Sequence, residues 1–336
     1  YQSVMGSFIG QSGEVITQNF DTFRFDTWRP YLWTVVFIVL TAVVLYAGVE
    51  KGIEKWSKVL MPMLFVIVAY LCVYAIFLPN SGEGYKFYFD FDFSKINADV
   101  VIAALGQAFF SLSLGMGAMM IYGSYIEKGT NLAKTSIQIA SLDTLVAVLA
   151  GLVVFPAVFS FGIDPAAGPQ LVFITLPTVF AQMTGGYIFS IFFFLLLAVA
   201  ALTSTISILE VQIATVAEEF KMNRKLSLVL VSVIMLVVCC MCSYSLIPVE
   251  GGNELVFFGV SLFDICDIIT SYIILPLGGL LIMLFLGWFY KKEDLHYVLV
   301  VETKCSEGLF KVYYFFLRFI APLLLLAVFL QQLGLF

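Results

Sequence analysis

Long apolar runs fill most of the chain, and short polar connections separate them. A helix needs about 20 apolar residues to cross the hydrocarbon of a membrane. Eight runs qualify: 31–49, 59–78, 100–126, 136–161, 187–216, 226–247, 260–290 and 308–332. They are too long and too continuous for the strands of about 10 residues that build outer-membrane barrels. The pattern therefore predicts an all-α, polytopic membrane protein.

Basic residues gather in alternate connections. Eleven Lys and Arg residues lie in the connections 50–58, 127–135, 217–225 and 291–306. The other connections carry only Lys86 and Lys95. The positive-inside rule places the first set in the cytoplasm and residues 1–30 on the extracellular side. We therefore expect an odd number of upstream spans to be missing, with residues 1–18 the end of a truncated helix. A short amphipathic surface segment is the alternative for these residues.

The composition narrows the class of function. The chain is 61% hydrophobic and 12% charged, whereas soluble domains have about 25% charged residues. These values exclude a soluble enzyme, a disordered chain and a nucleic-acid binder that relies on a basic surface. Cys239, Cys240 and Cys242 lie in one apolar run and are typical of interior residues rather than of a metal cluster. No nucleophile–base pair is apparent, so we do not expect an enzyme.

The stretch GQAFFSLSLGMG at 106–117 interrupts an apolar run with Gly106, Gly115 and Gly117. Glycine weakens a helix interior by about 1 kcal/mol relative to alanine. Unwound backbone at membrane depth is tolerated where it lines a cavity or is buried in protein. Broken helices then offer free carbonyls to cations and free N–H groups to carboxylates. The alternative is close packing of helices through small residues.

Two further places put polar groups inside apolar runs. Asp143 stands alone in its run, and at that depth it would be neutral or find a cation. A hydrogen bond from Ser or Thr to a protonated Asp143 is the alternative. Ala200, Thr203, Ser204 and Ser207 share one helix face by their spacing, which suits weak ligation of an ion such as Na⁺. Hydrogen bonding between helices is the alternative for this stripe.

For the other charged residues, the sequence is less specific about a role. We expect Glu210 to be a buried, hydrogen-bonded or protonated carboxylate. Asp264 and Asp267 are either charges of an external gate or part of a solvated loop edge. Arg318 is expected to pair with a lipid headgroup or a neighbouring helix. His296 is expected at the surface of a cytoplasmic connection.

Five blocks, in order, resemble the bacterial branch of the neurotransmitter:sodium symporters. They are GVEKGIEKWSKVLMP (48–62), GQAFFSLSLGMGAMMIYGSYI (106–126), LVFITLPTVFAQMTGG (171–186), AALTSTISILE (200–210) and LPLGGLLIMLFLGW (275–288). The resemblance covers essentially the whole chain. It implies the family's LeuT-like inverted repeat of five plus five helices, with substrate and sodium bound midway across the membrane.

The resemblance also implies a domain plan for an amino-terminally truncated chain. Residues 1–30 correspond to the end of the third helix and an extracellular connection, and 31–78 to two helices of the incomplete first repeat. The complete second repeat covers 99–290, with an extracellular loop at 162–186, and 308–332 is the final helix. The family's first helix, which supplies substrate contacts and most remaining sodium ligands, has no counterpart here.

Residue roles follow from the same resemblance. The substrate-binding positions are matched by Phe110, Ser111, Ser113, Met116, Ser204, Ser207 and Ile208. Ser111 and Asp143 match the first sodium site, and Ala200, Thr203 and Ser204 match the second. The gating positions are matched by Gln107, Tyr125, Glu218 and Asp267, of which Asp267 belongs to the outer gate and Tyr125 and Glu218 to the cytoplasmic gate.

The function implied is a sodium-coupled symporter that imports a neutral amino acid by alternating access. Met116 stands where a rigid ring could stand, which favours a bulky apolar or aromatic substrate. Two Na⁺ ions are expected as coupling ions, and no cofactor. Many relatives have Asn at the position of Asp143, and its additional negative charge predicts that chloride is not required.

Alternatives stay open for the activity and the assembly. One is a proton-coupled amino-acid carrier of the same fold, with Asp143 or Glu210 as the proton site. Another is a truncated, non-transporting remnant that acts as an interaction protein. The expected partners are a small amino acid and the lipid bilayer, without nucleic acid, in a bacterial cytoplasmic membrane. A monomer and a homodimer are both compatible with the sequence.

Overall fold

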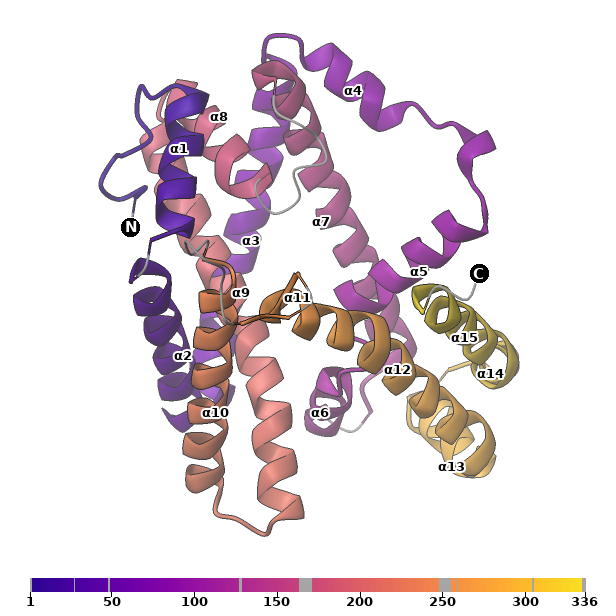
Figure 1. Ribbon diagram of the computed structural model, residues 1–336. Coiled ribbons are helices and arrows are strands. Elements are labelled where there is room, and N and C mark those ends of the chain that lie inside the picture. The colour runs from indigo at the N-terminus through magenta and orange to yellow at the C-terminus, as the bar shows by residue number, and fades with distance from the viewer. Residues whose placement is uncertain are drawn as a thin grey trace. The chain divides into compact units, whose positions relative to one another are not determined.

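The computed structural model describes residues 2–26, 28–47, 49–126, 129–162, 171–247, 255–257, 259–303 and 305–333. Almost every regular element is a helix (Figure 1). The chain divides into two compact units, which are described separately. The first contains Tyr1–Phe91 and Leu145–Gly259, and the second contains Asp92–Thr144 and Val260–Phe336.

The first unit holds the early helices and the middle of the chain. Its elements are α1 (Gly13–Arg24), α2 (Arg29–Ala47), α3 (Val49–Ile76), α4 (Ser81–Phe89), the π-helix η2 (Leu171–Thr175), α8 (Leu176–Gln182), α9 (Gly186–Glu219), α10 (Arg224–Ser245) and the strand β1 (Val256–Phe257). The long helix α7 (Leu132–Phe161) enters this unit at Leu145. Residues 2–10, before α1, form consecutive turns.

The second unit holds the broken helix and the last spans. Its elements are η1 (Phe93–Lys95), α5 (Ala98–Ser111), α6 (Ala118–Tyr125), the first part of α7, the strand β2 (Val260–Ser261), α11 (Leu262–Asp267), η3 (Ile268–Ile274), α12 (Leu275–Leu284), η4 (Phe285–Phe289), α13 (Lys292–His296), η5 (Tyr297–Glu302), α14 (Glu307–Phe315), η6 (Phe316–Ile320) and α15 (Ala321–Gln332). The elements η3, η4, η5 and η6 are π-helical stretches that continue neighbouring α-helices.

The described spans agree with the apolar pattern. Six helices among the described residues are long and apolar enough to cross a membrane: Arg29–Ala47, Leu132–Phe161, Gly186–Glu219, Arg224–Ser245, Leu262–Phe289 and Glu307–Gln331. A bent pair, Met61–Ile76 with Ser81–Phe89 at 114°, includes most of the run 59–78. The remaining run, 100–126, is divided between α5 and α6. The protein is thus a polytopic all-α membrane protein.

Two expected connections contain helices in their described parts. Residues 50–58 belong to α3, whose 28 residues correspond to about 42 Å of helix, longer than the hydrocarbon core of about 30 Å. The basic start of α3 can therefore extend beyond the bilayer. Residues 163–170 of the expected extracellular loop 162–186 lie outside the described residues. The rest of it contains η2 and α8, and residues 176–180 of α8 are all buried. Apolar residues such as Leu176 and Phe180 explain this burial, because they pack with Leu71 and Leu196 in one hydrophobic cluster.

A proline and a tyrosine fix the outer part of α7 in the first unit. Pro156 lies inside α7 and has no N–H, so the carbonyl of Leu152, four residues earlier, lacks its usual helical partner. The hydroxyl of Tyr85 in α4 donates to this carbonyl at 3.4 Å. A Cβ at Gly84 would lie 2.5 Å from Cα of Pro156, so only glycine permits this approach. The contact docks α4 on α7.

A buried ion pair joins α9 to α10. Figure 1 shows α2, α9 and α10 side by side, and their contact is apolar through residues such as Leu45, Leu209 and Val231. The side chain of Glu210 is 8% exposed, and Nη2 of Arg224 lies 2.9 Å from both of its carboxylate oxygens. The prediction that Glu210 is buried and hydrogen-bonded is confirmed, whereas its partner was not foreseen.

Removing this partner should destabilise the protein. In Arg224→Ala the Glu210 carboxylate would stay buried without its cation, and we expect a loss of about 2 kcal/mol, below the 3–5 kcal/mol of fully buried pairs because Arg224 is half exposed. The measurement is equilibrium or thermal unfolding of the purified protein in detergent. Arg29→Ala is the control, because Arg29 pairs with Asp26 at 3.4 Å with 62% of its side chain exposed. Equal losses for both variants would contradict the expectation.

Candidate functional site

The helix that carries the candidate substrate residues is broken. α5 ends at Ser111 and α6 begins at Ala118, and residues 112–117 between them are not helical. Ser113 has φ 54°, and Gly115 and Gly117 both have φ 83°, a left-handed region that favours glycine. The predicted break is confirmed, although Gly106 lies within α5 and the unwinding begins only after Ser111.

Close backbone packing accompanies the break. A Cβ at Gly115 would lie 2.5 Å from the carbonyl oxygen of Leu275, and one at Gly278 would lie 2.7 Å from the carbonyl oxygen of Gly115. The alternative interpretation, close packing through small residues, therefore also describes this stretch. Gly115 serves both purposes, because it turns the chain and lets α12 approach it.

A carboxylate from α7 meets the end of α5. The hydroxyl of Ser111 lies 2.7 Å from Oδ1 and 2.8 Å from Oδ2 of Asp143, and donates to this carboxylate. Both residues belong to the second unit, and Asp143 is half-buried. The pair gathers three oxygens next to an unwound backbone, which is a ligand set for a hard cation. It also matches the hydrogen bond from Ser that we weighed as the alternative.

The hydroxyl stripe of α9 lies in the first unit. The hydroxyl of Thr203 donates to the carbonyl of Ala200 at 2.7 Å, and that of Ser204 reaches the same carbonyl at 3.4 Å. The hydroxyl of Ser207 donates to the carbonyl of Thr203 at 2.8 Å. Ala200, Thr203 and Ser204 thus bring three oxygens together within one turn. Ile208, the next substrate candidate along the helix, is 40% exposed.

The candidate cation ligands in the described part of the chain are oxygens of hydroxyls, carbonyls and single carboxylates. The described residues include no group of three or more His, Cys, Asp or Glu placed to hold a metal ion. Cys239, Cys240 and Cys242 are not joined in disulfides. This donor set suits an alkali cation better than a transition metal.

A cavity of about 820 Å³ lies in the second unit among α5, η3, α12 and α15. Gln107, Phe110 and Asp267 line it, so three residues predicted from the sequence share one cavity. Asp267 accepts a hydrogen bond from the hydroxyl of Ser271 at 2.9 Å. The lining also includes Asp99, Ile102, Ala103, Gly106, Phe109, Tyr272, Leu275, Pro276, Leu325, Val328 and Gln331.

One polar contact in this cavity was not expected from the sequence. The side-chain amide of Gln331 donates to Asp99 at 2.7 Å and joins α15 to the start of α5. Gln331 is a polar residue at the end of an apolar run, which is the one signal that could have drawn attention to it. Asp264 belongs to the start of α11 instead, where it accepts a hydrogen bond from Ser261 at 2.6 Å. The loop-edge interpretation fits Asp264.

Four candidate residues remain. Ser113 and Met116 lie within the break, and Met116 is half-buried. Glu218 is exposed near the end of α9. Tyr125 is the last residue of α6, and its side chain lies outside the described part of the chain. The structure thus places Ser111 with Asp143, Ala200 with Thr203 and Ser204, and Gln107 with Phe110 and Asp267.

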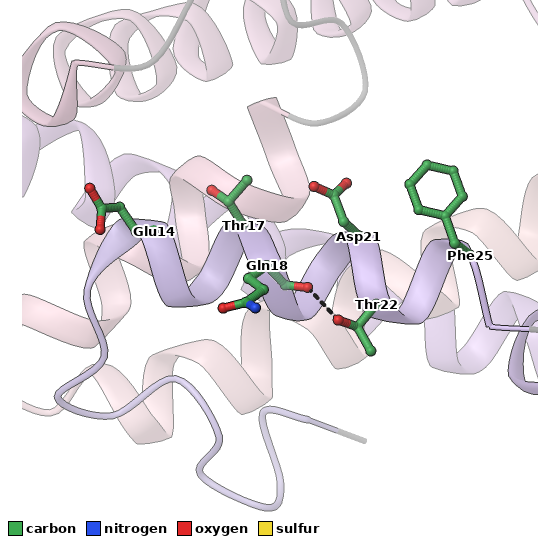
Figure 2. Close-up of a pocket in the computed structure, with 6 residues that line it drawn as sticks. All are labelled: Glu14, Thr17, Gln18, Asp21, Thr22 and Phe25. Atoms are coloured by element: carbon green, nitrogen blue, oxygen red, sulfur yellow. Dashed lines mark hydrogen bonds between the residues drawn. The ribbon is translucent and has the colours of Figure 1, made fainter. Parts of the chain in front are cut away.

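A second cavity, of about 580 Å³, runs along α1 in the first unit (Figure 2). Its lining, Glu14, Thr17, Gln18, Asp21, Thr22 and Phe25, comes from one helix and its end. Figure 2 shows these side chains along one stretch of α1, with the hydroxyl of Thr22 bonded to the carbonyl of Gln18. Ile16 is buried, and Phe20 stacks on Phe173. None of the residues predicted to bind substrate or sodium lies here.

The chain is similar to known proteins over most of its length. The profile of the sodium:neurotransmitter symporter family matches residues 29–336. The sodium-dependent transporter YhdH of Bacillus subtilis is 38% identical over 301 residues, which are 89% of this chain and 66% of YhdH. A sodium-dependent transporter of Haemophilus influenzae is 38% identical over 312 residues, 90% of this chain and 66% of that protein.

A solved structure is similar over nearly the whole chain. The crystal structure of MhsT in complex with L-phenylalanine superposes with a TM-score of 0.89 and 37% identity, over 98% of this chain and 74% of MhsT. The chain spans about two thirds, 66%, of the length of the two curated relatives. The matched region includes the broken helix, Asp143 and the hydroxyl stripe, and the chain belongs to the sodium:neurotransmitter symporter family.

Proposed function

We propose that the protein is a sodium-coupled symporter that imports a neutral, bulky apolar or aromatic amino acid by alternating access. The observation that carries the proposal is the contact of Ser111 with both oxygens of Asp143 beside the unwound stretch 112–117. A carboxylate, a hydroxyl and unwound backbone are the groups that membrane carriers use to hold a cation together with a substrate carboxylate.

Two oxygen groups would hold the sodium ions that enter with the substrate. Ser111 and Asp143 form the first, and Ala200, Thr203 and Ser204 form the second. To bind sodium at the first oxygen group, the hydroxyl of Ser111 has to break its hydrogen bond to the carboxylate of Asp143 and point its lone pairs at the cation. The substrate carboxylate would bind close to this sodium. Each positive charge that moves inward gains about 2.3 kcal/mol per 100 mV of membrane potential.

Three side chains support the substrate class. Phe110 and Ile208 are 55% and 40% exposed, so neither is committed to packing within its unit. Met116 is flexible and polarizable and can adapt to a large apolar group. MhsT, with 37% identity, has been crystallised in complex with L-phenylalanine, which favours an aromatic substrate here as well.

The alternatives have less support. In a proton-coupled carrier, Glu210 or Asp143 would take up and release a proton. Glu210 is held by Arg224 at 2.9 Å, so protonating it would break the ion pair of a buried carboxylate. A non-transporting interaction protein would have no need of the two oxygen groups.

Uptake of L-phenylalanine into proteoliposomes tests the proposal on the intact natural protein. We expect an inward sodium gradient to drive uptake, and uptake to fall to background when potassium replaces sodium. Asp143→Ala should abolish sodium-driven uptake, because it removes a ligand from the first oxygen group. Glu14→Gln, which changes an exposed carboxylate on α1, is the matched control. Uptake that follows a pH gradient in sodium-free buffer would instead favour the proton-coupled carrier.

The carboxylate of Asp143 should make transport independent of chloride. We expect uptake by the parent protein to be unchanged when gluconate replaces chloride. In Asp143→Asn the negative charge is lost, and added chloride should restore part of the uptake because an anion can supply that charge. The measurement is initial uptake rate at several chloride concentrations. A parent protein that stops transporting without chloride would refute this expectation.

A rigid ring at position 116 should narrow the substrate range. We expect Met116→Phe to weaken competition by tryptophan for leucine uptake about tenfold while alanine competes as before, since the ring removes adaptable volume. Met120→Phe is the control, because Met120 is 59% exposed in the same helix region. Equal competition by glycine and tryptophan in the parent protein would count against a bulky substrate.

A further inference from the structure

A group of basic and aromatic side chains lies where η4 meets α14 and η6 in the second unit. We call Trp288, Lys292, Tyr314 and Arg318 the inner-leaflet cluster. The guanidinium carbon of Arg318 lies 4.5 Å from the centroid of the Trp288 ring. The ammonium of Lys292 lies 5.1 Å from the centroid of the Tyr314 ring. Each cation therefore rests on an aromatic ring of the cluster.

Backbone contacts hold the cluster in place. The indole N–H of Trp288 donates to the carbonyl of Arg318 at 3.2 Å, and the hydroxyl of Tyr314 donates to the carbonyl of Gly287 at 3.3 Å. A Cβ at Gly287 would lie 3.1 Å from Cα of Arg318, so the two helices approach closely here. The predicted contact of Arg318 with a neighbouring helix is confirmed. The cluster is preorganised, because these bonds fix both rings.

The charge of Arg318 is not balanced by a carboxylate among the described residues. Its Nη1 lies 3.5 Å from the hydroxyl of Tyr314, and its Nε is buried without a hydrogen-bond partner in the described part of the chain. Arg224 and Arg29, by contrast, both lie next to a carboxylate. A cation within an apolar run is costly unless it is paired or reaches the membrane surface. Arg318 therefore calls for an anion from outside the described chain.

The order of residues places the cluster at a membrane surface. Trp288 is at the end of an apolar stretch and is followed by Tyr290, Lys291 and Lys292. Trp and Tyr concentrate at the headgroup level, and basic residues follow on the cytoplasmic side. Because Arg318 stacks on Trp288, it lies at the same level. Trp288 is 55% exposed, so a lipid can reach this ring.

We propose that the inner-leaflet cluster binds the phosphate of an anionic phospholipid in the cytoplasmic leaflet. Basic pockets between helices on this side of a membrane recognise such headgroups. The planar guanidinium of Arg318 can donate to two phosphate oxygens, and Lys292 adds a second charge on the other side of Tyr314. With two cations and no carboxylate in the cluster, an anionic headgroup is favoured over a zwitterionic one.

Neighbouring acidic residues do not neutralise the cluster. Glu307, at the start of α14, lies 2.9 Å from Nε2 of His296 and so has its hydrogen-bond partner within the same connection rather than in the cluster. Glu293 and Asp294 are exposed in the first turn of α13. Because these carboxylates lie beside Lys292, they weaken its attraction for anionic lipids farther away. We therefore expect one lipid in direct contact with the cluster rather than a diffuse shell of lipids.

Native mass spectrometry of the intact, delipidated protein tests the proposal. Dioleoylphosphatidylglycerol and dioleoylphosphatidylcholine, which share their acyl chains, are titrated separately. We expect one phosphatidylglycerol to bind in preference to phosphatidylcholine. Arg318→Gln and Lys292→Gln should each reduce this preference about fivefold, the effect of one basic residue near a charged surface. Arg318→Lys, which keeps the charge, should retain most of it.

Lys225→Gln is the matched control, because Lys225 also rests on an aromatic ring, 5.2 Å from the centroid of Tyr46, but lies in the first unit. Its preference should equal that of the parent protein. Lys292 lies in an exposed turn, so Lys292→Gln tests the site even if Arg318→Gln fails to fold. An unchanged preference in Lys292→Gln and in any folded Arg318→Gln protein, or an equal loss in Lys225→Gln, would overturn the proposal. Displacement of the lipid by inorganic phosphate alone would overturn its assignment to a lipid headgroup.

Discussion

Backbone polar groups within an apolar span need partners inside the protein, and the break at 112–117 shows how this requirement is met. The N–H groups of Leu112 and Ser113 turn back to the carbonyls of Ala108 and Phe110, which closes the end of α5. Gly115 then brings the unwound chain against the carbonyl of Leu275, where no side chain would fit. The unwound stretch is thus closed on one side and fixed against α12, and its remaining polar groups are those a ligand could use.

The same requirement explains the polar side chains in the long helices. Ser111 donates a hydrogen bond to Asp143, and Arg224 forms an ion pair with Glu210. The carbonyl of Leu152, which lacks a helical donor because of Pro156, accepts from Tyr85. These contacts join segments that are distant in sequence, apart from Glu210 and Arg224, which a short turn separates. They connect helices at defined points where apolar packing alone would allow sliding.

The sequence could predict what depends on local pattern. Apolar runs indicate the spans, glycines indicate the break, and an isolated Asp143 indicates a partner because a lone carboxylate is costly there. The burial of α8 could not be predicted, because Leu176 and Phe180 are also compatible with an exposed loop until the positions of α3 and α9 are known. The partner of Glu210 was missed for a related reason. Arg224 is at a helix start in a basic connection, where the positive-inside rule already accounts for it.

Comparing the arginines shows how position decides the partner of a charge. Arg29 is the first residue of its span, and its exposed side chain pairs with the half-buried Asp26, where water screens the charges. Arg224 reaches along α9 to Glu210, whose burial makes an internal cation necessary. Arg318 stacks on Trp288 at the end of a span and has no carboxylate among the described residues. A carboxylate buried in protein must find its counter-charge within the chain, whereas a cation at the headgroup level can find one in the membrane. This difference explains why the described residues give Glu210 a partner of opposite charge but provide none for Arg318.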